Sequence, residues 1–149
     1  MKTSIMSLAS TALLVSLACG LPCIAEAIVF VPYGEGTLPS GDLVQSYQVT
    51  LSPGESVPWH YHPGPVYAVI VSGMLTEDEG CGREIQYINA GAAFTETTGR
   101  VHQVFNFGSV PVVITVTLVV PSAYAGYNSN IYVDGPRCEG KSGRSHLEP

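Results

Sequence analysis

Residues 54–73 read GESVPWHYHPGPVYAVIVSG, and residues 91–106 read GAAFTETTGRVHQVFN. Each stretch combines glycines and histidine with runs of Val, Tyr, Phe and Thr that are typical of short β-strands. Residues two apart in a strand face the same side, so the imidazoles of His60 and His62 are expected on one face. His102 begins another predicted strand after a turn at Gly99, and closure of the strands into a barrel would bring it to the same interior.

The segments around these two stretches also have the pattern of β-strands. Residues 112–120 are the clearest case, because Val, Ile and Leu alternate there with Thr and Val at a period of two. Past residue 27 no stretch shows a sustained helical repeat of apolar residues, so we predict an all-β domain without a long helix. The predicted strands cover residues 28–31, 43–51, 56–62, 67–71, 74–76, 84–88, 92–95, 101–106 and 112–120.

The two histidine-bearing stretches resemble the two signature motifs of the cupin superfamily. In the first motif a glycine is followed after five residues by His-x-His, then by a glutamate and, six residues later, by a second glycine. In the second motif Gly, Pro, Gly, His and Asn follow one another at fixed spacing. The positions of this chain that match are Gly54, His60, His62, Gly73, Gly91, Gly99, His102 and Asn106.

This resemblance implies a fold and a ligand set. The fold is an all-β, single antiparallel β-barrel or jelly roll over residues 28–139. The ligands are His60, His62 and His102, which would hold one divalent transition metal: Fe, Mn, Zn, Ni or Cu all accept imidazole. A small-molecule ligand or substrate, and a homodimer formed through strand edges, are further implications of the resemblance.

Two positions depart from the cupin pattern. Thr97 stands where proline is usual, which affects the stiffness of a turn. Val66 stands where the metal-binding glutamate is usual, and valine has no electron pair to donate. A site of three neutral histidines would leave the full double charge on the metal and keep coordination positions open, as catalytic sites do. It would also bind metal more weakly, so an empty site is an alternative.

Glu96 is the acidic residue considered as a replacement for the missing carboxylate. It lies six residues before His102, but a turn separates the two, so strand alternation does not define the direction of its side chain. We expect Glu96 to be a solvent-exposed residue of a turn. The side chains expected to line the barrel interior or to fill the core are Val69, Val71, Phe94, Phe105 and Phe107.

The N-terminus has the pattern of a secretory signal peptide. Lys2 precedes an apolar stretch over residues 5–21, and the small-x-small sequence at residues 25–27 is typical of a cleavage site. Small polar residues interrupt the stretch, so a transmembrane anchor is not expected. A lipoprotein signal at Cys19 or Cys23 fits poorly, because neither follows a Leu-small-small box. The prediction is a secreted or periplasmic protein.

Cleavage after residue 27 would leave 122 of the 149 residues, enough for one domain, with a disordered tail over residues 140–149. The formal net charge is −6 and the few basic residues form no patch, so nucleic acids and anionic membranes are not expected partners. Cys81 and Cys138 would remain. They are expected either to form a disulfide that ties the C-terminal segment to a hairpin loop or to stay free thiols.

Two functions fit these features almost equally well. The first is an enzyme, a metal-dependent dioxygenase or isomerase that acts on a small oxygenated molecule. The second is a non-catalytic barrel that binds a metal or a small ligand. The replacement of the motif glutamate by Val66 and the expected export, which makes ferrous iron hard to keep reduced, favour the second function slightly.

Overall fold

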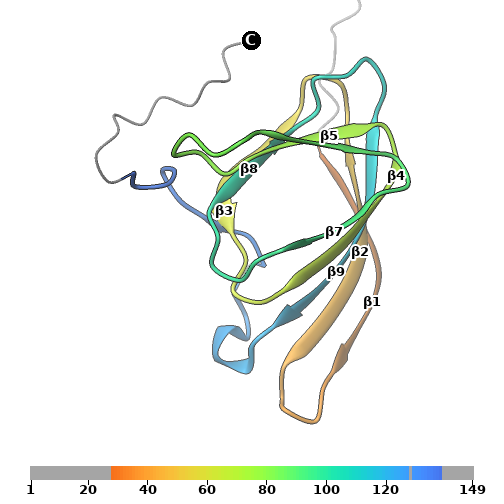
Figure 1. The fold of residues 1–149 in the computed structure, drawn as a ribbon. Coiled ribbons are helices and arrows are strands. Elements are labelled where there is room, and N and C mark those ends of the chain that lie inside the picture. The colour runs from red at the N-terminus through yellow and green to blue at the C-terminus, as the bar shows by residue number, and fades with distance from the viewer. Residues whose placement is uncertain (1–27, 128, 139–149) are drawn as a thin grey trace, which may run out of the picture.

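The computed structural model describes residues 28–127 and 129–138, and apart from one 3₁₀ turn its regular elements are β-strands (Figure 1). The predicted all-β composition is therefore confirmed. Two predicted strands, β2 and β9, have the predicted bounds. The elements are β1 (Val29–Thr37), β2 (Leu43–Leu51), β3 (Ser56–Tyr61), β4 (Val66–Ser72), β5 (Met74–Asp78), β6 (Gln86–Asn89), β7 (Ala93–Glu96), β8 (His102–Phe105), β9 (Val112–Val120), η1 (Ser122–Tyr124) and β10 (Ile131–Tyr132).

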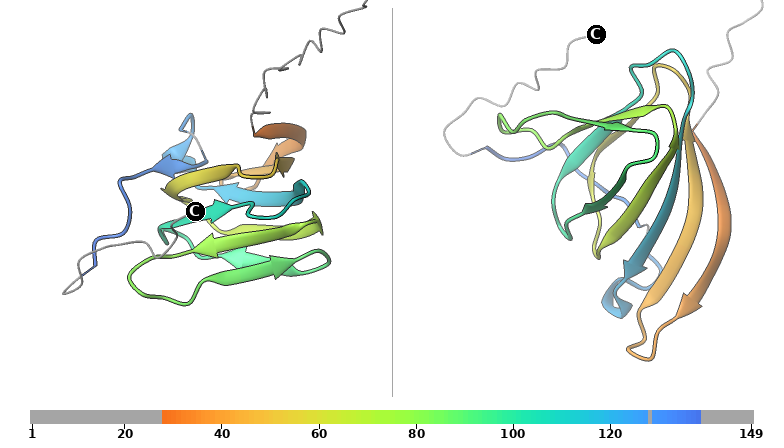
Figure 2. Two further views of the ribbon diagram at one scale, coloured as in Figure 1. Left: turned by 90° about the horizontal axis from the view of Figure 1, so that it is seen from above. Right: turned by 45° about the vertical axis from the view of Figure 1, so that its right-hand side comes forward.

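The strands form two antiparallel five-stranded sheets with the orders β1-β2-β9-β4-β7 and β10-β3-β8-β5-β6. Figures 1 and 2 show these sheets facing each other around a common interior. Among the described residues, the strand ladders stay within one sheet or the other. The two-sheet architecture is thus established, whereas closure of the sheets into a barrel goes beyond these ladders.

Period-two alternation determines which side chains fill the interior. Along β9 every second residue is buried, from Val112 to Val120, as the sequence predicted. In β4, Val66, Ala68 and Ile70 are buried by the same rule. Together with residues of β2, β5 and β8 they form one apolar core between the sheets. Burial of apolar surface of this kind is the main stabilising contribution to such a fold.

The first and last strands differ most from the sequence expectation. The first was predicted to end at residue 31, but β1 continues through Pro32 and two glycines to Thr37. This is possible because β1 is an edge strand with a register shift between Pro32 and Gly34, and a proline at an edge removes no ladder hydrogen bond. The two-residue strand β10 is too short to leave a periodic signal.

Asn106, the last residue of the second motif, connects the end of β2 to the turn before β9. Its Nδ2 donates hydrogen bonds of 2.9 Å to the carbonyls of Leu51 and Val110, and its Oδ1 accepts one of 2.9 Å from the amide of Gly108. The side chain is almost fully buried. Backbone groups at the end of β2 and in the turn before β9 are thereby satisfied inside the protein, which explains why the motif ends in an asparagine.

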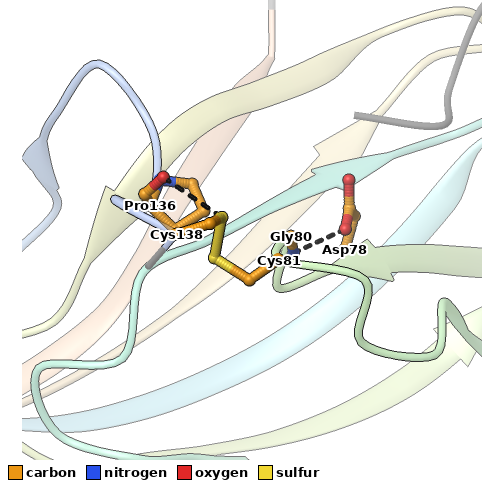
Figure 3. The surroundings of a disulfide bond; sticks show 5 residues. All are labelled: Asp78, Gly80, Cys81, Pro136 and Cys138. Carbon is orange, nitrogen blue, oxygen red and sulfur yellow. Dashed lines mark hydrogen bonds between the residues drawn. A yellow bond between two sulfur atoms is a disulfide. The ribbon is translucent and has the colours of Figure 1, made fainter. Parts of the chain in front are cut away.

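The C-terminal segment is attached to β3 and to the loop after β5. β10 pairs with β3 so that Tyr132 lies opposite His60, and the amide of Val133 donates to the carbonyl of Trp59. Farther along, Cys138 forms a disulfide with Cys81, with the two Cα atoms 5.3 Å apart (Figure 3). Of the two alternatives that the sequence left open, the disulfide is confirmed.

The predicted signal peptide, residues 1–27, and the predicted disordered tail, residues 140–149, lie outside the described residues. Within residues 28–127 and 129–138, the structure has no helix with the length and apolar character needed to cross a bilayer.

Replacing both cysteines with serine (Cys81→Ser with Cys138→Ser) is expected to lower the free energy of unfolding by about 2–4 kcal/mol, because the bridge closes a long loop. Urea denaturation followed by circular dichroism measures this change. Reduced wild-type protein should lose a similar amount, and the double variant should not respond to the reductant. Equal unfolding midpoints for the oxidised wild type and the double variant would contradict the prediction.

Candidate metal centre

The three predicted histidines converge in the structure. His60 lies in β3, His102 opens β8, and the two are directly opposite each other in the antiparallel ladder. His62 follows the end of β3. The ring centroids are 4.3 Å apart for His60 and His102, 5.0 Å for His60 and His62, and 5.4 Å for His62 and His102. All three side chains are buried. One ring nitrogen of each lies within 4.8 Å of the others, so the cluster is able to hold a metal ion.

A register shift in β3 helps to place His60. Val57 pairs with Val104, but the next recorded pair is His60 with His102, so the ladder is irregular between Val57 and His60. Both Val57 and His60 are buried although they are three residues apart, which simple alternation would not allow. The irregularity includes Pro58, which has no amide to donate, and a bulge is one of the few places where a paired strand accepts proline.

Backbone carbonyls hold each imidazole by its Nδ1 atom. The Nδ1 atoms of His60, His62 and His102 lie 2.7, 2.9 and 3.0 Å from the carbonyl oxygens of Pro58, Ser129 and Arg100 respectively. A carbonyl can only accept, so each Nδ1 carries the proton and donates it. The Nε2 atoms are left to face the cluster. This is the arrangement by which proteins orient histidine ligands of a metal.

Arg100, whose carbonyl accepts the hydrogen bond from His102, also takes part in an ion-pair network with Glu79 and Arg83. The Arg100 guanidinium lies 2.7 Å from the carboxylate of Glu79. Glu79 is also 3.1 Å from the guanidinium of Arg83. The loop after β5 is thereby connected to the segment before β8. The Glu79 carboxylate is buried, so the two partly exposed guanidinium groups compensate a charge that the protein largely withdraws from water.

Glu96 belongs to the cluster, contrary to the expectation of a solvated turn glutamate. It is the last residue of β7, its side chain is only 10% exposed, and its Oε2 lies 2.9 Å from Nε2 of His62. Its Oε1 lies 3.5 Å from Nε2 of His102. In the β4–β7 ladder Glu96 is directly opposite Val66. The carboxylate missing from the motif position is therefore present on the adjacent strand.

Glu77 is a second buried carboxyl at this site. The predicted strand ended at residue 76, but β5 extends to Asp78, and the side chain of Glu77 is buried. Glu77, Glu96 and His102 present ligand atoms within 4.8 Å of one another. The sequence contained a signal for the burial of Glu77. It lies two residues after the core residue Leu75, and strand alternation sends both side chains to the same face.

Burial and neighbouring charges change the pKa values of these groups in different directions. Burial, reinforced by His102, lowers the pKa of His60 to about 4. Burial raises the pKa of Glu77 to about 7, with a further contribution from the charge of Glu96. For Glu96, burial favours the neutral form, but the nearby imidazoles of His102 and His62 outweigh it and lower the carboxyl pKa. Burial likewise opposes charging of His102, but Glu96 outweighs it and raises the imidazole pKa.

A small interior cavity of about 50 Å³ adjoins the cluster. Its polar lining includes His60, His62, Glu96 and Asn130, and most of the remaining lining is apolar, for example Val66. Of the five side chains predicted for the interior or core, Phe94 is confirmed as a wall. Phe105 is partly buried and stacks on Phe107 with centroids 5.0 Å apart. The prediction is wrong for Val69, Val71 and Phe107, which are 43%, 57% and 51% exposed.

Comparisons with known proteins agree with this fold. The model of the family described as Cupin domain matches residues 47–120, which include both histidine-bearing stretches. A cupin superfamily protein from Desulfitobacterium hafniense is 12% identical over 64% of this chain and 79% of its own, with a TM-score of 0.53. A cupin domain from Bordetella pertussis is 18% identical over 62% and 92%, with a TM-score of 0.52.

A conserved protein with a double-stranded β-helix domain from Klebsiella pneumoniae is 25% identical to this chain. The likeness covers 64% of this chain and 77% of that protein, with a TM-score of 0.49. No curated protein sequence matches the chain.

The low pKa of His60 predicts that its imidazole stays neutral in metal-free protein at about pH 5, where an exposed histidine is mostly protonated. Since the unfolded chain takes up this proton more readily, the contribution of His60 to stability is lost as the pH falls from about 6.5 towards about 4. Titration of the imidazole NMR signals measures the first effect, with His60→Gln to assign the signal and urea-unfolded protein as the control. A midpoint for His60 equal to that in urea would contradict the prediction.

Proposed function

The chain belongs to the cupin superfamily, and from this premise we propose that His60, His62 and His102 hold one divalent transition-metal ion. The support is chemical as well as geometric. Nε2 of His102 is buried and has no hydrogen-bond partner among the described residues. An orphaned nitrogen in a protein interior is costly unless something binds it. A metal ion would satisfy this nitrogen. It would also bind the Nε2 lone pairs of the other two imidazoles, which are free because the backbone carbonyls hold each ring by Nδ1.

We further propose that Glu96 is the fourth ligand. The single observation that carries this proposal is its place opposite Val66, with carboxylate oxygens 2.9 and 3.5 Å from the Nε2 atoms of His62 and His102. Ligand atoms bound about 2.1 Å from one ion lie roughly 3 Å from one another. The observed separations are therefore suitable for two ligands of the same ion. A set of three histidines and one carboxylate suits Fe, Mn, Ni or Zn in particular.

The function best supported by this site is that of a metal-dependent enzyme that acts on a small oxygenated molecule, by isomerase or dioxygenase chemistry. When bound, a divalent metal would polarise an oxygen atom of the substrate. The protein would supply the rest. Carbonyl-anchored histidines keep the ligand set rigid, apolar walls such as Val66 and Phe94 exclude water, and Glu77 lies where its carboxyl oxygens could hold or transfer a proton.

A non-catalytic domain that binds a metal or a small ligand is the second candidate. The observation that favours it is the small, largely apolar interior cavity of about 50 Å³, which leaves room for only a small group beside the ligands. The two candidates share the metal site and differ in whether a bound molecule is converted.

We also propose the setting in which the site operates. Residues 28–139 would form one cupin domain whose two sheets close around the site as a barrel or jelly roll. Residues 1–27 would be a signal peptide that directs the protein to the periplasm or the medium. The Cys81–Cys138 disulfide supports export, because such bonds persist in oxidising compartments. The exposed edge strand β1 is the surface on which we place a homodimer.

Glu96→Gln is expected to weaken zinc or manganese binding by roughly tenfold or more, because the ligand set loses its charge. Moving the carboxylate across the ladder, as Val66→Glu combined with Glu96→Gln, should restore most of the affinity. Competition with a fluorescent chelator and elemental analysis measure both effects. Glu84→Gln, which removes an exposed carboxylate, is the matched control. Wild-type affinity in Glu96→Gln would contradict the role of Glu96, and retention of metal by His60→Ala would contradict the whole site.

Turnover of a panel of small oxygenated compounds is expected to require the metal, to be abolished by His60→Ala, and to fall by about 10²-fold or more in Glu77→Gln. The measurement compares metal-loaded and chelator-stripped protein, with Glu84→Gln as the control for loss of a carboxylate. Full activity in stripped protein would rule out a metal enzyme. Tight binding of a compound without turnover would select the non-catalytic candidate instead.

A further inference from the structure

A second, larger cavity adjoins the metal site. Its volume is about 450 Å³, within the range of pockets that bind small molecules. It lies between strands β1 and β2 on one side and the C-terminal segment, residues 129–132, on the other. Phe30, Tyr47 and Asn130 line both this outer cavity and the interior cavity beside the histidines. The outer cavity is therefore the approach to the metal site.

Three aromatic rings dominate the outer cavity. The rings of Phe30 and Tyr47 are 6.0 Å apart, with their planes at 59°. Across the cavity, the ring of Tyr132 lies 6.0 Å from that of His60. Phe30 and Tyr132 are 50% and 54% exposed, so large ring surfaces face this space. Aromatic surfaces held in a concave site favour a flat, apolar ring as their partner, because ring–ring contact adds to the gain from burial alone.

The polar groups of the outer cavity are uncharged or acidic. Gln45 and Ser46 lie beside Glu35, and the Gln45 amide donates a hydrogen bond of 3.3 Å to the Glu35 carboxylate. None of the described residues that line either cavity is Lys or Arg. A free carboxylate or phosphate would thus meet Glu35 without a compensating cation, whereas hydroxyl groups could donate hydrogen bonds to these oxygens. The lining of the outer cavity therefore offers an anion no cationic partner of its own.

The two cavities differ in volume and would accommodate different parts of a ligand. The interior cavity of about 50 Å³ holds little more than one water-sized group, whereas a benzene ring needs a cavity on the order of 150 Å³. A ring must therefore remain in the outer cavity while a substituent enters the interior. Tyr47, a wall of both cavities, marks the boundary between them.

From these features we propose that the outer cavity binds a neutral hydroxylated aromatic ring, with catechol as the simplest example, and directs its hydroxyl oxygens past Tyr47 to the metal. This proposal rests on the proposed function, because the metal is the partner of the ligand's oxygen atoms. It goes further in naming the chemical class of the ligand and the surface that recognises it.

The test is calorimetric titration of zinc-loaded protein under anaerobic conditions with three probes. Catechol carries both the ring and the hydroxyls, cyclohexane-1,2-diol keeps the neutral hydroxyls without an aromatic ring, and oxalate is a small dianion that chelates metals. Catechol should bind at least tenfold more tightly than either of the others. Oxalate or the cyclohexane diol binding as tightly as catechol would overturn the proposal, since the selectivity would then come from the metal or from the hydroxyls alone.

Variants of the cavity walls distinguish recognition by the cavity from chelation by zinc. Tyr132→Ala is expected to weaken catechol binding by about two- to tenfold, the value of one aromatic contact. Tyr132→Phe, which keeps the ring, and Tyr87→Ala, which removes an exposed tyrosine of β6 outside both cavities, should bind as the wild type does. Unchanged affinity in Tyr132→Ala would overturn the proposal.

Zinc content is measured for each protein. Failure of the wild type to take up zinc would overturn the proposed function together with this inference, whereas zinc uptake without selectivity for catechol overturns this inference alone.

Discussion

The candidate site depends on two pairs of residues that stand opposite each other in antiparallel ladders. His60 faces His102 in one sheet, and Val66 faces Glu96 in the other. Register is decisive in such ladders, because a slip of one residue sends every side chain to the opposite face. Both sheets must therefore keep their register at the same time for the histidines and the carboxylate to meet. The apolar core between the sheets enforces this, since a slip would expose residues such as Ile114 and Leu118.

The same register explains how buried titratable groups are tolerated. Each imidazole donates from Nδ1 to a carbonyl, so one of its two nitrogens is satisfied by backbone that the fold already places there. Glu96 compensates the second nitrogen of His62, since its Oε2 lies 2.9 Å from Nε2 of that ring. Nε2 of His102 lies 3.5 Å from Oε1 of Glu96 and remains without a hydrogen bond among the described residues. Buried polar groups left in this condition are characteristic of functional sites rather than of structural cores.

Much of the fold was predictable from local pattern, and part of the site was not. The histidines were found because His-x-His, a turn glycine and a third histidine are local signals whose consequences follow from strand alternation. Glu96 was misjudged because its neighbour across the ladder, Val66, is 30 positions away in the chain, and adjacency of this kind is a property of the sheet. Ser129, whose carbonyl orients His62, was missed for the same reason. The burial of Glu77 could have been predicted. Had the predicted strand been extended by two residues, strand alternation would have placed this side chain on the interior face.

The position of the carboxylate has a consequence for chemistry. Val66 and Glu96 both line the interior cavity. In the ligand set proposed above, Glu96 from β7 would supply the charge that the motif glutamate supplies in the cupin pattern. The lining of the interior cavity differs from the cupin pattern. The β4 position contributes the apolar side chain of Val66, and the carboxylate belongs to Glu96 on the neighbouring strand β7. A molecule that moves inward from the outer cavity therefore passes Tyr47, Phe30 and the apolar walls before it reaches the carboxylate of Glu96. Because charges are solvated poorly in such surroundings, the arrangement favours neutral ligands and strengthens every polar contact that they make at the histidine cluster.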